Sequence, residues 1–139
     1  MKLLTVSTML SLFTLHVPAS VLYVDLNCTN ATSPYSDWGS AATNIQDAVD
    51  ASTDGDQIFV TNGVYKTGGR VVYGLLTNRV AITKAILVQS VNGPGVTAIQ
   101  GNPVLGNSAV RCVYLANGSL LSGFTLTNGG TMNSGDAYL

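Results

Sequence analysis

Acidic residues are the first groups in this sequence whose spacing suggests chemistry. All seven acidic side chains are aspartates, and the closest two, Asp54 and Asp56, are separated by a single glycine. Carboxylate oxygens are the ligands that Ca²⁺ prefers, so a calcium site is one interpretation of this stretch. Asp-Gly-Asp directly after a helix is also typical of a turn, which we favour. The sequence therefore predicts no catalytic, cofactor-binding or metal-binding residues, with calcium as an open alternative.

Histidine and cysteine offer little further chemistry. The one histidine, His16, lies in an N-terminal segment that we expect to be removed, which excludes histidine-dependent catalysis from the remaining chain. Two cysteines, Cys28 and Cys112, cannot by themselves supply the four ligands of a zinc site. An oxidising compartment would permit them to pair, whereas a free thiol is ordinary in the apolar run around Cys112. Their pairing stays open.

Basic residues are few and scattered. Six Lys and Arg against seven acidic residues give a formal net charge of −1, and no basic cluster of the kind that binds phosphate groups is present. Nucleic acid is therefore not expected as a partner. Arg70, Arg79, Lys84 and Arg111 are candidates for binding acidic sugars, although single cations are normally solvated surface groups.

Aromatic residues suggest a second way of binding sugars. Trp38, Tyr65 and Tyr73 are predicted to lie in loops, where a flat ring face can stack on the apolar face of a sugar. Packing beneath the loops is the alternative that we favour for them. A polysaccharide or cell-surface glycan is the partner that these residues suggest.

The first twenty residues have the pattern of a signal peptide. A positive start at Met1-Lys2 precedes an uncharged, mostly apolar run from Leu3 to Val17, and Val17-Pro18-Ala19 places small residues at a cleavage site. The apolar run is too short to span a bilayer, and no longer run follows it. We expect a signal peptide over residues 1–20, a mature chain that begins near Ser20 or Val21, and export without a membrane-spanning helix.

One helix is predicted early in the mature chain. A short strand over Val21–Val24 and a polar loop to Ser40 come first. Thr43 with Gln46 then matches a capping box, and the turn at Asp54-Gly55 ends the helix. One face carries the apolar stripe, with Gln46 and the acidic residues on the face toward water; the stripe is formed by Ile45, Ala48, Val49 and Ser52.

Short strands follow the helix, with no further helix between them. They are expected near Gln57–Val60, Val80–Ile82, Ile86–Gln89, Thr97–Ile99, Cys112–Leu115 and Gly123–Leu126. This pattern excludes a doubly wound α/β sheet. Asn-Gly pairs at residues 62–63, 92–93 and 128–129 recur at intervals of 30 and 36 residues, about the length of one solenoid turn, although hairpins also use Asn-Gly.

The sequence resembles a known family in the stretch that runs from Tyr23 through the helix (Asn44-Ile45-Gln46-Asp47-Ala48-Val49-Asp50-Ala51) to Gly63-Val64-Tyr65. It is similar there to the N-terminal entry of pectin-lyase-like proteins of the bacterial secreted type. The similarity continues through Arg79–Lys84, Ile86–Ser90 and Leu121–Gly129. The resemblance implies an all-β fold: a right-handed parallel β-helix with an N-terminal amphipathic capping helix, truncated at its C-terminus. The expected organisation is the strand, loop and capping helix over residues 21–56 and the first rungs over residues 57–139.

Function is less constrained by this resemblance, because such proteins include lyases, hydrolases and adhesins. The family's catalytic residues usually lie on central rungs, so none is carried over and this chain alone is expected to be inactive. We expect a structural, adhesive or carbohydrate-interacting part of a secreted or cell-surface protein. The alternative is the non-catalytic N-terminal part of a polysaccharide lyase or glycoside hydrolase.

Overall fold

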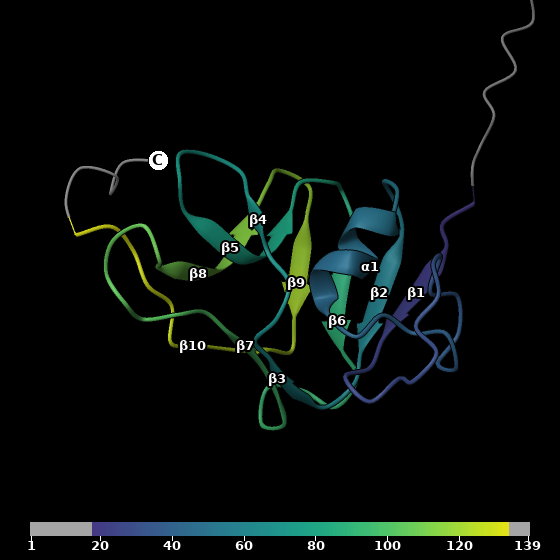
Figure 1. Ribbon diagram of the computed structural model, residues 1–139. Coiled ribbons are helices and arrows are strands. Elements are labelled where there is room, and N and C mark those ends of the chain that lie inside the picture. Colours follow the sequence, from purple (N-terminus) through teal and green to yellow (C-terminus); the bar gives the residue numbers. More distant parts are fainter. Residues whose placement is uncertain (1–17, 134–139) are drawn as a thin grey trace, which may run out of the picture.

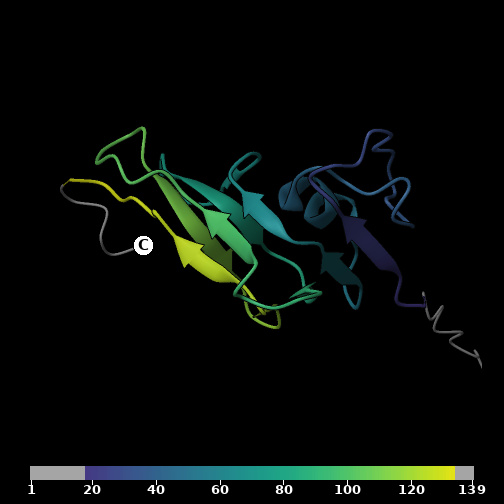
Figure 2. The same ribbon diagram turned by 90° about the horizontal axis from the view of Figure 1, so that it is seen from below.

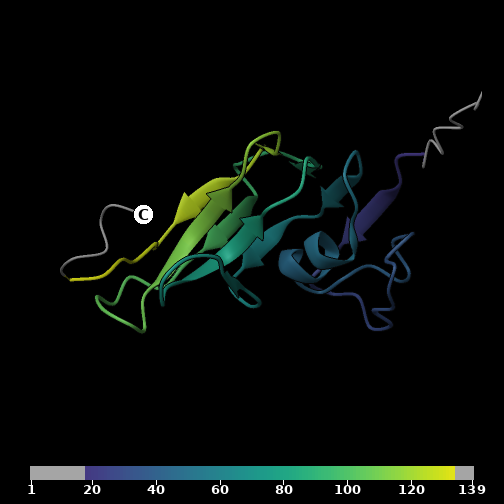
Figure 3. The same ribbon diagram turned by 90° about the horizontal axis from the view of Figure 1, so that it is seen from above.

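Short apolar strands coil into a β-solenoid of about three turns in the computed structural model, which describes residues 18–133 (Figure 1). Most of the predicted signal peptide, residues 1–17, lies outside the described residues, as do residues 134–139. The strands follow one another along the molecule from the purple N-terminal strand to the last, yellow strand (Figures 2 and 3). The prediction of a mostly β protein built as a coil of parallel strands is therefore confirmed.

Three sheets form the walls of the coil. Sheet A has four parallel strands in the order β1 (Val21–Val24), β2 (Gln57–Val60), β6 (Leu87–Ser90) and β9 (Leu120–Ser122). Sheet B joins β3 (Gly63–Tyr65), β7 (Thr97–Gln100) and β10 (Thr125–Thr127), also in parallel. In sheet C, β5 (Thr77–Ile82) pairs in parallel with β8 (Val110–Leu115) and antiparallel with β4 (Arg70–Val71). One turn thus runs through β2, β3 and β5, and the next runs through β6, β7 and β8.

Inward-facing side chains from these sheets fill the coil. Leu22, Ile58 and Val88 occupy matching positions on neighbouring strands of sheet A and are at most 3% exposed. Full burial of an aliphatic side chain of this size is worth about 1.5–3 kcal/mol, so such columns are the main source of stability. The buried Ser90 hydroxyl donates a hydrogen bond to the Thr97 hydroxyl at 2.9 Å, so that a polar residue is accommodated in the same core.

Two of the three asparagines predicted to lie at corners stack on each other, and the third lies at a different corner. Asn62 and Asn92 both lie between sheets A and B, where the Asn92 amide donates to Asn62 Oδ1 at 2.8 Å. Asn128 instead follows β10, at the next corner of the coil. Gly123, with a φ of 80°, takes the corner that continues the first two and lies beside Ser90. The prediction that these pairs recur once per solenoid turn therefore fails for Asn128-Gly129. Glycine alone also supplies a positive φ, and Gly123 takes the matching corner instead.

The helix α1 (Ile45–Ala51) begins with a different cap from the one predicted. Asn44 is the N-cap, and its side-chain oxygen accepts a hydrogen bond from the Asp47 N–H at 3.0 Å. The prediction that Thr43 is the N-cap is wrong, because the amide of Asn44 reaches the third residue of the helix from an extended backbone. The helix ends at Ala51, with Ser52 as its C-cap, before the Asp54-Gly55 turn.

The buried face of α1 is wider than the predicted stripe. Ile45, Ala48 and Val49 are at most 1% exposed, as expected. Gln46 is only 3% exposed, so the prediction that it faces water is wrong. Its Oε1 accepts a hydrogen bond from the Ala81 N–H of β5 at 2.7 Å. The helix therefore contacts the backbone of sheet C through a polar side chain as well as the core through apolar ones.

The loop between β1 and α1 lies along the outer edge of β1. The Tyr23 N–H donates to the Tyr35 carbonyl at 2.9 Å, and the Ala42 N–H donates to the Tyr23 carbonyl at the same distance. The Asp25 N–H donates to the Ala42 carbonyl, also at 2.9 Å. These bonds occupy backbone groups on the edge of β1 that faces away from β2. The loop thus takes the place that a preceding strand would fill.

Candidate functional site

The two closely spaced aspartates are both used within the fold. Asp54 Oδ1 accepts the Ala85 N–H at 2.9 Å and thereby ties the turn after α1 to the start of the next coil. Asp56 is 4% exposed and accepts three hydrogen bonds, from the Ser20 and Thr53 N–H groups and from the Thr53 hydroxyl. Residues 18–133 contain no group of three or more His, Cys, Asp or Glu side chains that could hold a metal ion.

Two of the candidate cations, Arg70 and Arg79, join separate elements of the fold. Arg70 Nη2 lies 2.5 Å from Asp50 Oδ2 in an ion pair whose side chains are 51% and 40% exposed. A pair this open to water contributes at most about 1 kcal/mol. Arg79 donates to the carbonyl of Gln100 at 2.8 Å and to that of Gly68 at 2.5 Å, and so joins sheet C to sheet B.

The other two cations also belong to the coil. Lys84 Nζ donates to three carbonyl oxygens at the C-terminal end of α1, those of Val49, Asp50 and Ser52, at 2.9, 2.9 and 2.5 Å. A cation at this end of a helix is favoured by the helix dipole. Arg111 lies on β8, in register with Asn78 of β5. The structure does not gather the four cations into one binding site.

Two of the three candidate aromatics lie away from any shared site. Tyr65 is part of β3, contrary to the prediction of a loop, and is 1% exposed. Burial raises the pKa of its hydroxyl, which donates to the Thr61 carbonyl at 3.0 Å. Tyr73 is 57% exposed and meets Tyr114 edge to face, with ring centroids 5.8 Å apart. Tyr65 is therefore a core residue, and Tyr73 belongs to a separate aromatic pair beside sheet C.

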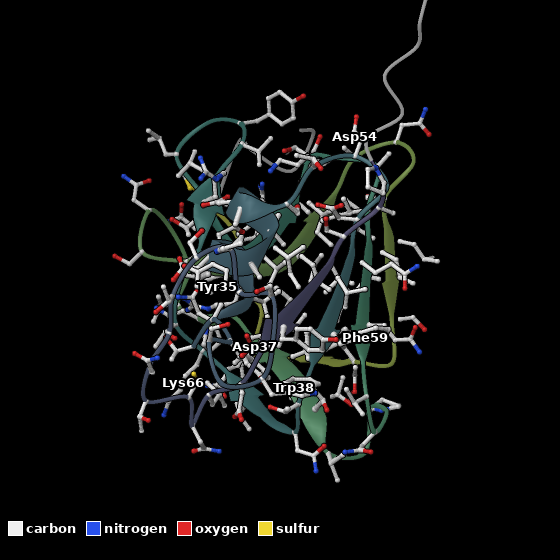
Figure 4. The ribbon with its side chains drawn as sticks, turned by 90° about the vertical axis from the view of Figure 1, so that its right-hand side faces the viewer. Tyr35, Asp37, Trp38, Asp54, Phe59 and Lys66 are labelled. Carbon is white, nitrogen blue, oxygen red and sulfur yellow. The ribbon has the colours of Figure 1, made fainter. Side chains whose placement is uncertain are left out.

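Three aromatic side chains gather on the outer face of sheet A, close to its N-terminal edge. Tyr23 of β1 and Phe59 of β2 are register partners that alternate with buried residues, so both project away from the core. Their ring centroids are 6.4 Å apart. Trp38 packs edge to face on Tyr23 with a centroid distance of 4.5 Å and remains 41% exposed. Tyr23, Trp38 and Phe59 form the aromatic surface, in which Tyr23 contacts both of the other rings. Figure 4 labels Trp38 and Phe59.

Polar groups continue the aromatic surface along sheet A. Gln89 of β6 is the register partner of Phe59, and Ser122 of β9 is the register partner of Gln89. Neighbouring strands are about 4.8 Å apart, so the row from Tyr23 to Gln89 spans about 10 Å. Flat apolar faces followed by amide and hydroxyl groups suit a ligand that itself has apolar faces and many hydroxyls.

The sequence carries a signal for this surface in its strands and not in its loops. Tyr23 and Phe59 lie in predicted strands, and of the three aromatic residues predicted to lie in loops only Trp38 belongs to the surface. In Val21–Val24 and in Gln57–Val60, the aromatic residue alternates with aliphatic residues that are buried. Parallel pairing of these two strands places both rings on one outer face.

Both cysteines are free thiols in the structure. Cys28 Sγ lies 3.4 Å from the Gly39 carbonyl, and Cys112 Sγ lies 3.2 Å from the Thr127 carbonyl. Cys112 also packs against the core, as the interpretation of a free thiol in an apolar run expects. Neither thiol contacts the aromatic surface through a described interaction.

Comparison with known proteins leaves the family open. No protein-family model matches the chain, and no curated protein or solved structure is significantly similar to it. The resemblance to pectin-lyase-like proteins therefore stays a prediction, and the β-solenoid assignment rests on the strand topology. Within residues 18–133, no helix has both the length and the apolar character needed to cross a membrane.

Proposed function

We propose that this chain is an exported β-solenoid module that binds carbohydrate without cleaving it, as part of a structural or adhesive protein. The aromatic surface carries the proposal. Stacking against sugar rings requires exposed aromatic faces on a rigid support, and two of the three rings are held by neighbouring strands of sheet A. Trp38 could also serve only to pack the loop against β1. That role would not require the polar side chains of Gln89 and Ser122 to follow Tyr23 and Phe59 on the same face of sheet A.

The finer architecture belongs to the same proposal: a right-handed parallel β-helix of the pectin-lyase-like type, with α1 as its N-terminal cap. The contacts of Gln46 with Ala81 and of Tyr35 with Tyr23 support the cap, because they occupy backbone groups on strand edges that no strand covers. Leu115 and Leu126, whose register partners Ile82 and Ile99 are buried, are 47% and 51% exposed at the opposite end. Further turns in a longer parent protein would cover these side chains.

Export is proposed from the leader pattern of residues 1–20. Only 9% of residues are charged, so the surface is nearly neutral and rich in hydroxyl and amide groups. Such a surface is compatible with a protein that is located outside the cell. The alternative function, the non-catalytic end of a polysaccharide lyase or glycoside hydrolase, shares the same fold. The two functions differ in the residues expected on later turns of the parent protein, because catalysis would require clusters of Asp, Glu and Arg there.

The proposal is tested by titrating the protein with soluble neutral and acidic polysaccharides. Trp38 is the only tryptophan, so its fluorescence reports directly on the aromatic surface. We expect at least one polysaccharide to shift the emission, and Phe59→Ala to weaken its binding at least about tenfold, which corresponds to 1.4 kcal/mol. Calorimetry replaces fluorescence for Trp38→Ala, where a similar loss is expected.

Tyr73→Ala is the matched control, because it removes an exposed aromatic residue outside the aromatic surface. It should bind like the unchanged protein. Binding that survives Phe59→Ala and Trp38→Ala but is lost in Tyr73→Ala would contradict the proposal, as would a complete absence of binding. Release of unsaturated or reducing sugar ends by the purified chain, with or without calcium, would contradict its non-catalytic part.

A further inference from the structure

Asp56 is a buried carboxylate whose oxygens are held from two sides. Its Oδ2 accepts the Thr53 N–H at 2.7 Å and the Thr53 hydroxyl at 3.1 Å. Its Oδ1 accepts the backbone N–H of Ser20 at 2.7 Å, from a residue 36 positions earlier in the sequence. The adjoining Ser20 carbonyl accepts the Gln57 N–H at 2.9 Å, which extends the pairing of β1 with β2 by one residue. Ser20 is thus fixed at both its nitrogen and its oxygen.

No cation is paired with this carboxylate in the described part of the chain. The ion pair found there joins Arg70 to Asp50, and Lys84 acts on Asp56 only through its longer-range charge. A carboxylate that is only 4% exposed is costly to bury without a partner of opposite charge. The three neutral donors, together with the charge of Lys84, more than offset that cost, since they hold the pKa of Asp56 below its ordinary value. A positive charge at the nitrogen of Ser20 would stabilise the carboxylate further.

The leader pattern places such a charge at Ser20. Val17 and Ala19 are the small residues that precede the predicted cleavage site, so hydrolysis of the Ala19–Ser20 bond is one of the two cuts that the sequence allows. In that reaction, catalysed by a signal peptidase, water adds across the bond: Ala19 leaves with a new carboxyl group and Ser20 keeps a new amino group. At neutral pH this amino group is largely protonated.

We infer that Ser20 is the first residue of the mature chain and that its α-ammonium group is bound by Asp56 as a partly buried ion pair. The inference rests on the proposed export. It distinguishes the two allowed cuts, because cleavage after Ser20 would remove the nitrogen that Asp56 Oδ1 contacts.

A pocket beside the contact has room for the charged group. Ser20, Thr53 and Asp56 line it together with residues of β1 and the following loop, and its volume is about 200 Å³. An ammonium group has three donors, of which Asp56 takes one. The remaining donors can be hydrated in this pocket. Removal of the leader would therefore replace a hydrogen bond from a neutral N–H by one from a charged ammonium group, so that both partners of the bond carry a charge.

The stability test compares a chain that starts at Ser20 with one that keeps Pro18 and Ala19. At about pH 7, where the α-amino group of an unfolded chain is still largely charged, the chain with the free amino group should melt on the order of 5 °C higher. Asp56→Asn should abolish that difference. Asp54→Asn is the matched control and should preserve it, because Asp54 contacts Ala85 and not Ser20. Equal melting of the two chains, or a difference that survives Asp56→Asn, would overturn the inference.

A second measurement does not depend on whether Asp56→Asn folds. The ion pair raises the pKa of the Ser20 amino group, so acylation of this amine at pH 7 should be at least about tenfold slower in the folded protein than in urea, the factor that one pKa unit gives. Stabilisation by a group of raised pKa is complete below its unfolded value and is lost as the pH rises through the folded value. Equal acylation rates would overturn the ion pair.

The site of cleavage is checked on protein exported by a bacterial host. Amino-terminal sequencing should give Ser20 as the first residue. A chain that starts at Val21 would overturn the inference while leaving export intact. An intact Met1 on protein outside the cell would contradict removal of the leader, and the glycan-binding proposal would stand or fall separately on its own titration.

Discussion

The side chain of Gln46 pairs with the backbone of Ala81 as a neighbouring strand would. The Ala81 N–H donates to Gln46 Oε1 at 2.7 Å, and Gln46 Nε2 lies 3.4 Å from the Ala81 carbonyl oxygen. Gln46 Nε2 also donates to Asp50 Oδ1 at 2.8 Å, which holds the amide in this orientation. A helix thereby satisfies backbone groups of β5 beyond Thr77 and Asn78, the residues that pair with β4.

Gln46→Ala should therefore destabilise the fold by about 2 kcal/mol, because a buried backbone N–H and carbonyl lose their partners. Chemical denaturation measures the free energy of unfolding. Gln57→Ala is the control, since Gln57 has the same side chain but is exposed at the start of β2, and its loss should stay within about 0.5 kcal/mol. Equal losses in the two variants would show that the pairing with Ala81 is not stabilising.

The apolar side of α1 gives a second prediction. Ile45→Asp and Val49→Asp should each cost several kcal/mol, roughly 3–5, because each places an unpaired charge in the core. Ala51→Asp should cost far less, because Ala51 is exposed at the end of the helix. Thermal unfolding of the three variants is the measurement. Similar melting temperatures in all three variants would mean that the apolar side of the helix does not contribute to the core. Gln46→Asp should also be costly, because Gln46 is buried and does not face water as the sequence predicts.

Alternation of apolar and polar residues made most of the strands predictable. The bounds of β1 and β2 are those expected from the sequence, and the other expected strands are shifted by at most three residues at either end. The strand β3 (Gly63–Tyr65) was not predicted, because its first residue belongs to the Asn62-Gly63 pair, which indicates a corner. The strand β9 (Leu120–Ser122) was not predicted either.

Contacts between distant segments were harder to predict. Nothing local to Gln46 indicates that it reaches Ala81, 35 residues later. The aromatic surface likewise depends on the parallel register of β1 with β2, which composition cannot supply. The sequence suggests only a surface cation at Lys84. Its partners are backbone carbonyl groups, which leave no pattern in the sequence, so these contacts cannot be predicted from it.

Asp56 predicts a defined response to acid. Burial alone would raise the pKa of its carboxyl group, but hydrogen bonds from the Thr53 and Ser20 backbone and from the Thr53 hydroxyl, with the charge of Lys84, bring it below the ordinary value of 3.8. A lowered pKa means that the stabilisation is present above the unfolded value and is lost as the pH falls through the folded value.

Asp56→Asn should thus lower the free energy of unfolding by about 1–3 kcal/mol at pH 6, and the gap should close below about pH 3.8. Urea unfolding of both proteins between pH 2.5 and pH 6 measures it, with the pH limits set roughly by the aspartate titration range. A gap that stayed constant over this range would mean that the charge of Asp56 does not stabilise the fold.

Close packing of successive turns predicts a sharp contrast between two glycines. A Cβ on Gly101 would collide with the Val110 carbonyl oxygen and would come within 2.8 Å of the Asn128 carbonyl oxygen. Gly95 has no atom within 4 Å of the same position. Gly101→Ala should cost about 3 kcal/mol, whereas Gly95→Ala should be neutral or slightly stabilising. Melting temperatures of the two variants decide, and equal values would argue against the packing of β7 with the corner after β10.

Chemical-shift mapping shows whether carbohydrate binds at the aromatic surface. A soluble polysaccharide fragment that binds in titration is added to labelled protein, and the resonances of the Trp38 indole and of Tyr23, Phe59 and Gln89 are followed. We expect these resonances to shift together with one saturation curve, while those of Tyr73 stay in place. Shifts confined to Tyr73, or saturable binding that leaves Trp38 and Phe59 unmoved, would contradict binding at the aromatic surface.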